Sequence, residues 1–141
     1  MAKSKYDKYF TIKCVKPHPE KEGVFLTTTR GLEWSGGGNY SIDCFFISSP
    51  RLMITQPHQH EFPQYLHFFS ANPYDATEFD AEVEISLGEE GVKYIITQPT
   101  AVYIPAKLHH GPLNFAKINK PILFVDLALS GKYTRIDDTP D

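Results

Sequence analysis

The sequence predicts one all-β domain, a sandwich or barrel of short strands. About ten stretches rich in β-branched and aromatic residues alternate with clusters of Gly, Pro, Asn and Asp. No stretch carries apolar residues at helical spacing over three turns. The 141 residues are enough to bury a core, and no linker, repeat or low-complexity segment divides them. Residues 1–141 are therefore predicted to form a single domain.

The first three predicted strands are short and clearly bounded. Residues 9–15 are rich in β-branched and aromatic side chains, and Pro17 then interrupts the pattern. Residues 24–29 and 41–47 follow, and the glycine-rich segment between them, 31–38, is expected to form a hairpin loop. A phosphate-binding loop is not favoured, because no helical pattern and no Lys-Ser or Lys-Thr pair come after the glycines.

The remaining predicted strands have the same character, with turn residues between them. They comprise residues 51–55, 64–69, 81–87, 92–97, 101–104, 115–118 and 122–129. Both ends of the chain, residues 1–8 and 131–141, are polar and are expected to be frayed tails.

Composition and charge disfavour several classes of function. A net charge of -3 and an isoelectric point near 6.0 predict no basic surface for nucleic acid or an anionic membrane. The N-terminal residues show no secretory signal, and no apolar run reaches the roughly 18 residues of a membrane span. Cys14 and Cys44 are expected to be reduced thiols, and the protein is expected to be cytoplasmic.

Two histidine-rich stretches carry most of the chemistry that the sequence offers. Five of the six histidines fall in or beside them, which makes a shared site the first hypothesis. On a strand, His58 and His60 project from the same face because side chains alternate with a period of two. Gln64 begins the next predicted strand and His110 follows another, so these four side chains can converge on one metal ion.

The first stretch resembles the first motif of the cupin superfamily of small jelly-roll barrels. That motif has two histidines separated by one residue, followed by a glutamate and then a glycine. Here His58 and His60 match the histidines. Gln64 stands in the glutamate position and Ala71 in the glycine position, so the match is partial.

The second stretch resembles the second cupin motif. Pro105, His110 and Asn114 match its proline, histidine and asparagine at the same spacing. Pro99 and Lys107 stand where glycines are usual. The proline, histidine and asparagine spacing is the more specific half of the resemblance.

The resemblance covers about residues 54–118 and implies a cupin jelly roll, a double-stranded β-helix, that pairs as a homodimer through edge strands. It assigns the metal ligands to His58, His60, Gln64 and His110. Three imidazoles and an amide leave the charge of a divalent ion uncompensated, so an anionic small molecule is the expected ligand or substrate. This ligand set suits Zn, Fe, Ni, Mn or Cu.

A carboxylate near the ion could restore negative charge and act as general acid or base. Glu61 lies between the ligands in sequence, and Glu82 and Glu84 lie on a strand predicted to be next to the site. Alternatively, Glu82 and Glu84 form the solvent-facing half of that strand. Glu84 and Glu61 are therefore the catalytic candidates, whereas His109 and His67 are expected to point away from the metal.

Three functions are compatible with these features. The favoured one is a metal-dependent enzyme in which the ion acts as Lewis acid on a small organic acid or carbonyl compound, with isomerase, lyase, decarboxylase or dioxygenase chemistry. The second is a small-molecule-binding or sensing module in which the metal only positions the ligand. In the third, the metal is structural or absent. A general acid or base within reach of the ion would distinguish the first from the second.

Overall fold

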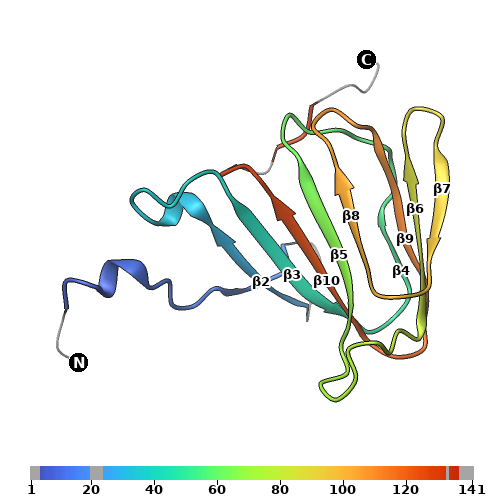
Figure 1. Ribbon diagram of the computed structural model, residues 1–141, viewed down its shortest axis with the longest axis horizontal. Helices are drawn as coiled ribbons and strands as arrows, with labels where there is room; N and C mark the ends of the chain where they lie inside the picture. The colour runs from blue at the N-terminus through green and yellow to red at the C-terminus, as the bar shows by residue number, and fades with distance from the viewer. Residues whose placement is uncertain (1–3, 20–23, 133, 137–141) are drawn as a thin grey trace.

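The computed structural model describes residues 4–19, 24–132 and 134–136, and this part of the chain forms ten β-strands in two antiparallel sheets (Figure 1). Apart from strands, it contains two short 3-10 helices, Asp7–Tyr9 and Gly31–Glu33. The strands are β1 (Val15–Pro17), β2 (Phe25–Arg30), β3 (Ser41–Ile47), β4 (Arg51–Ile54), β5 (Gln64–Ser70), β6 (Ala81–Leu87), β7 (Val92–Ile96), β8 (Thr100–Ile104), β9 (His110–Ile118) and β10 (Ile122–Ala128). The predicted all-β class is confirmed.

The two sheets face each other as the layers of a jelly roll (Figure 1). One sheet has the strand order β1-β2-β3-β10-β5-β8 and the other β4-β9-β6-β7. Strands that neighbour each other in the sheets are mostly far apart in sequence; for example, β10 pairs with both β3 and β5. The histidine-bearing segments before β5 and at the start of β9 are thereby brought to one end of the sandwich.

The hydrophobic core fills the space between the sheets away from these histidines. Its centre is a set of three rings, Phe68 on β5, Phe115 on β9 and Phe124 on β10, whose centroids lie 5.2–6.1 Å apart. Edge-to-face and tilted contacts at these spacings are favourable for aromatic pairs. These rings pack one part of the interior, and the part of the interior next to them contains a cavity.

The structure corrects the predicted start of two strands. Residues 10–14 form no strand, because Lys13 has a φ of +66°, which an extended strand does not allow, and the first strand is β1. Pro17 lies within β1 and is tolerated there because β1 is an edge strand. Strand β9 begins at His110 rather than residue 115, since the backbone N–H of His110 donates to His58 O and the N–H of His58 to His110 O, both at 2.9 Å.

The expectation of a frayed C-terminal tail is also corrected where the structure describes it. Ile136 forms a β-bridge with Gln59, and its N–H donates to Gln59 O at 2.9 Å. Residues 134–136 therefore lie against the segment that carries two of the histidines. Within the described ranges, no helix is long and apolar enough to cross a membrane.

Candidate metal centre

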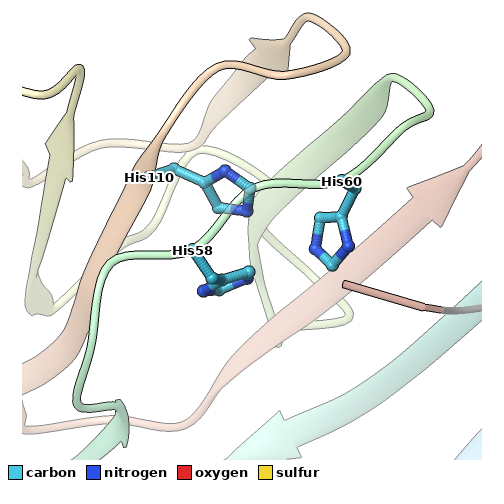
Figure 2. Close-up of side chains that lie close together, drawn as sticks. All are labelled: His58, His60 and His110. Carbon is cyan, nitrogen blue, oxygen red and sulfur yellow. The ribbon is translucent and has the colours of Figure 1, made fainter. Parts of the chain in front are cut away.

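Three histidine side chains converge at one end of the sandwich (Figure 2). His58 and His60 lie on the segment between β4 and β5, and His110 is the first residue of β9. One ring nitrogen of each lies within 4.8 Å of the others, a spacing at which all three could bind the same ion. Their exposed fractions are only 6%, 1% and 5%. The structure thus brings together the three histidines that the sequence selected.

Backbone carbonyls fix the tautomer of each ring. Nδ1 of His58 and Nδ1 of His110 each donate to the carbonyl oxygen two residues earlier in the chain, at 3.4 and 2.9 Å. Nδ1 of His60 donates to Thr134 O at 2.5 Å, so the C-terminal segment supplies the third acceptor. A carbonyl only accepts, so in each ring the proton sits on Nδ1 and the lone pair on Nε2. Such contacts orient metal-binding histidines.

The protonation state of the cluster also suits a metal. Burial, assisted by the neighbouring His110 and Arg135, lowers the pKa of His58 to about 3. Burial likewise lowers the pKa of His110 to about 4 and lowers that of His60. The rings are therefore neutral at neutral pH, the form that binds metals. Nε2 of His110 is buried and has no hydrogen-bond partner in the described part of the chain, so a divalent ion fits this position.

Gln64 lies beside the histidines and is held by Asp126 of β10. Gln64 is 1% exposed, and its Nε2 donates to both carboxylate oxygens of Asp126, at 3.0 and 3.1 Å. Because the amide nitrogen faces Asp126, the amide oxygen faces away from it. A glutamate at position 64 would place two carboxylates at this distance, where they repel each other. The neutral amide of Gln64 therefore avoids this repulsion and donates a hydrogen bond to the carboxylate of Asp126 on the neighbouring strand.

Asp126 was missed at the sequence level, although one signal was available. It lies two residues from Phe124 and two from Ala128, both buried, so the alternation of β10 places an acidic side chain on the inward face. A charge on a buried face is uncommon unless it is paired. The Gln64 contact provides that partner.

A cavity of about 720 Å³ opens from the histidines into the interior of the sandwich. Its described lining includes four basic side chains and two carboxylates, so its wall is net positive. These charged residues are Lys16, Arg30, Arg51, Arg135, Asp43 and Asp126. The apolar lining includes the rings of Phe45 and Phe124.

The second carboxylate in the cavity, Asp43, is already neutralised. Arg30 donates to it through two nitrogens, Nη1 to Oδ1 at 2.9 Å and Nη2 to Oδ2 at 3.2 Å. Thr28 Oγ1 donates to the same Oδ1 at 2.6 Å. Asp126 is therefore the cavity carboxylate that touches the proposed metal ligands.

The structure does not bring the predicted catalytic glutamates to the cavity. Glu61 is exposed and pairs with Lys107 at 3.9 Å. Glu84 accepts from Asn114 at 3.4 Å on the outer face of its sheet, and Glu82 is exposed. The reason is the register of β6, whose inward positions are apolar. The solvent-facing alternative for Glu82 and Glu84 is the one that agrees with the structure.

The two other motif-adjacent histidines lie where the sequence predicted. His67 is on the outer face of β5, next to the ring of Phe69 at a centroid distance of 5.2 Å. His109 lies at the rim, with its Nδ1 3.8 Å from Glu89 Oε1. Neither ring belongs to the cluster of three.

Backbone conformation explains two positions around the second motif. Lys107 occupies a position where cupins usually have glycine, and its φ is +67°, in the left-handed region that favours glycine. Gly111 has a φ of +105°, and a Cβ there would lie 3.0 Å from Gln56 O. The missing side chain lets the segment before His58 pass close to the start of β9.

Comparison with known proteins identifies the fold. A structure of Bacillus subtilis oxalate decarboxylase, from work on its Mn(II) centres, matches 89% of this chain and 30% of that chain, with a TM-score of 0.59 and 13% identity. Recombinant oxalate oxidase in complex with glycolate matches 92% of this chain and 63% of that chain, with a TM-score of 0.59 and 15% identity. This chain has the cupin fold.

The chain spans less than two thirds of the length of either neighbour. No protein-family model matches its sequence, and no curated protein matches it. Identities of 13% and 15% support the shared fold, while the chemistry has to be argued from the residues of the site.

Proposed function

We propose that the protein is a metal-dependent enzyme that holds one divalent transition metal on His58, His60, His110 and Gln64. The observation that carries the proposal is the set of three buried, neutral imidazoles, each held through Nδ1 by a backbone carbonyl. A bound ion would supply Lewis acidity to a carboxylate or carbonyl oxygen of a small organic acid. Zn, Fe, Ni, Mn and Cu all suit imidazole and amide ligands.

The chain's own residues would prepare the cavity for such a substrate. The net positive wall attracts an anion, and the apolar lining around Phe45 and Phe124 limits the water that surrounds it. Asp126 orients Gln64 and is the carboxylate best placed to hold or move a proton near the histidines. The structural neighbours, an oxalate decarboxylase and an oxalate oxidase bound to glycolate, support a small organic acid.

Metal content tests the proposal directly. Untagged protein purified without added metal would be analysed by mass spectrometry, comparing wild type with His110→Ala, Gln64→Ala and the control His67→Ala. We expect about one equivalent of one transition metal in wild type and His67→Ala, loss in His110→Ala and weakening in Gln64→Ala. A wild type that carries no metal and takes up none would overturn the proposal.

Turnover separates an enzyme from a binding module. The metal-loaded protein would be incubated with small hydroxy, keto and dicarboxylic acids, and oxygen uptake, carbon dioxide release and isomer formation would be measured. Iron would direct the first assays to oxygen chemistry, and zinc, nickel or manganese to isomerase and lyase chemistry. Acid binding without turnover would favour the sensing module, in which the metal only positions its ligand.

We also propose that the protein is a homodimer. Five large apolar side chains near the N-terminus are each more than half exposed in the single chain, and the segment that carries most of them projects from the sandwich (Figure 1). They are Tyr6, Tyr9, Phe10, Ile12 and Val15. Clustered exposure of this kind is typical of a protein interface. Light scattering coupled to size exclusion should give twice the monomer mass of 16.0 kDa, and a monomer would refute this.

The cytoplasm remains the proposed compartment. Cys14 and Cys44 are both free thiols, as expected of a protein kept in a reducing environment. Thiol titration of unfolded protein prepared from its native host would test this, with two titratable thiols as the expected result.

A further inference from the structure

Arg51 is a half-buried cation for which the described residues form no ion pair or hydrogen bond at two of its guanidinium nitrogens. Its Nε and Nη2 atoms are buried, and neither has a hydrogen-bond partner among the described residues. The other cavity arginine near β3, Arg30, has a double hydrogen bond to Asp43, so the contrast lies within the same cavity. Buried charged donors without acceptors are strongly unfavourable, and because no described residue supplies an acceptor here, they favour a bound anion.

The guanidinium of Arg51 points into the interior. Arg51 starts β4 in the four-stranded sheet, but its guanidinium carbon lies 5.0 Å from the centre of the Phe45 ring, on β3 of the opposite sheet. It therefore reaches across the cavity that it lines together with His58 and His110. A cation–π contact with the ring holds the guanidinium in place and leaves its N–H groups for an acceptor with two oxygens, such as a carboxylate.

The register of β4 and β9 separates this cation from the histidines. Arg51 lies opposite Phe115, and His58 lies opposite His110, five positions away along β9. At about 3.3 Å per residue, that is a backbone separation of roughly 16 Å. The wall between the two ends is apolar, with Leu113 of β9 on one side.

The size of the cavity agrees with a ligand that spans part of this distance. The 720 Å³ volume equals that of about two dozen water molecules at ~30 Å³ each. A two-carbon acid would occupy a small part of it. The rings of Phe45 and Phe124, 5.6 Å apart between centroids, offer a surface for a flat apolar group next to Arg51.

We propose that Arg51 binds the carboxylate of an organic acid whose apolar body, about the size of one ring, lies against Phe45 and Phe124 and whose other end faces the histidines. This proposal rests on the proposed function only for the end of the ligand that would face the metal. Binding of the carboxylate by Arg51 needs no metal and can be tested without it.

The test uses matched pairs of an acid and its neutral amide on the full chain, with and without metal. The pairs are phenylacetate, 3-phenylpropanoate and cyclohexanecarboxylate with their amides, and oxalate is the short comparison. Affinities are measured by calorimetry for wild type, Arg51→Met, Arg51→Lys and Lys93→Met, the last a matched loss of positive charge at an exposed side chain.

In metal-free wild type and Lys93→Met, we expect at least one ring acid to bind ten-fold or more tightly than its amide. Arg51→Met should reduce this ratio to within two-fold, and Arg51→Lys should give an intermediate ratio. Wild type that shows no preference for any acid over its amide, or Arg51→Met that keeps the preference, overturns the proposal. If Arg51→Met does not fold, an unchanged ratio in Arg51→Lys overturns it.

Metal loading distinguishes this inference from the proposed function. A preference for the acid that depends on Arg51 in protein that takes up no metal supports the carboxylate site while the enzyme proposal fails. The opposite result is metal uptake and turnover together with an acid-to-amide affinity ratio that Arg51→Met does not change. That result would support the proposed enzyme and overturn the carboxylate site at Arg51.

Discussion

Replacing Asp126 with asparagine should weaken metal binding about ten-fold, although Asp126 is not itself a proposed ligand. In wild type the amide nitrogen of Gln64 donates to both oxygens of this carboxylate, at 3.0 and 3.1 Å. Asparagine offers one acceptor and no charge, so a charge-assisted contact becomes a neutral one. Hydrogen bonds to charged groups are worth about 1.5–3 kcal/mol and neutral ones about 0.5–1.5 kcal/mol, a difference of roughly 1–1.5 kcal/mol. That difference corresponds to about ten-fold in affinity.

The assay is competition for Co²⁺ and Zn²⁺ against a chromophoric chelator at pH 7. Asp43→Asn is the matched control, because it removes the same charge from the same cavity, but Asp43 pairs with Arg30 and not with Gln64. Asp126→Leu removes every acceptor and should approach about a hundred-fold loss, the upper end of the range seen when a hydrogen-bond partner of a metal ligand is removed. Equal losses in Asp126→Asn and Asp43→Asn would refute orientation of Gln64 as the cause.

Three further outcomes are expected. On acidification, metal-free protein should lose stability from about pH 6.5 towards pH 4, because unfolded histidines take up protons there while the lowered pKa values of His58 and His110 keep the folded rings neutral. For His110 alone, the loss of folding stability at pH 4 is about 3 kcal/mol. Urea unfolding of His110→Ala should therefore show a weaker dependence of stability on pH, and the same dependence as in wild type would contradict this. Lys107→Gly should raise the free energy of unfolding by about 0.5–1 kcal/mol through relief of the left-handed φ, whereas a lower midpoint in urea would argue against strain. Truncation after Lys132 should weaken Zn²⁺ binding by removing the acceptor of the His60 Nδ1 proton, and equal affinity in the truncated and full chains would contradict this role of Thr134.

The histidine cluster was predictable because its signals are local. His58 and His60 are separated by one residue, and the alternation of an extended segment places both on one face. His110 was found through the resemblance of its stretch to the second cupin motif, in which Pro105 and Asn114 also match. Local spacing decided these positions, and the structure places the three rings together.

The positions of the other cavity residues depend on which strands pair and in which register, and this cannot be read from a single sequence. Asp126 meets Gln64 because β10 pairs with β5 in a register that sets Ala128 opposite Gln64. Arg51 crosses to Phe45 only because β4 and β3 belong to opposite sheets. The alternation of Glu82 and Glu84 was visible, but which face of that strand is buried follows from the packing of the two sheets.

The acceptor for His60 comes from Thr134, which follows every other residue of the metal centre in the chain. During synthesis, both histidine-rich stretches leave the ribosome before this carbonyl does. A nascent chain can therefore gather its histidines while one ring still lacks the contact that sets its proton. In the proposed metal centre, the ring of His60 therefore gains the acceptor for its Nδ1 proton only after residue 134 has been synthesised.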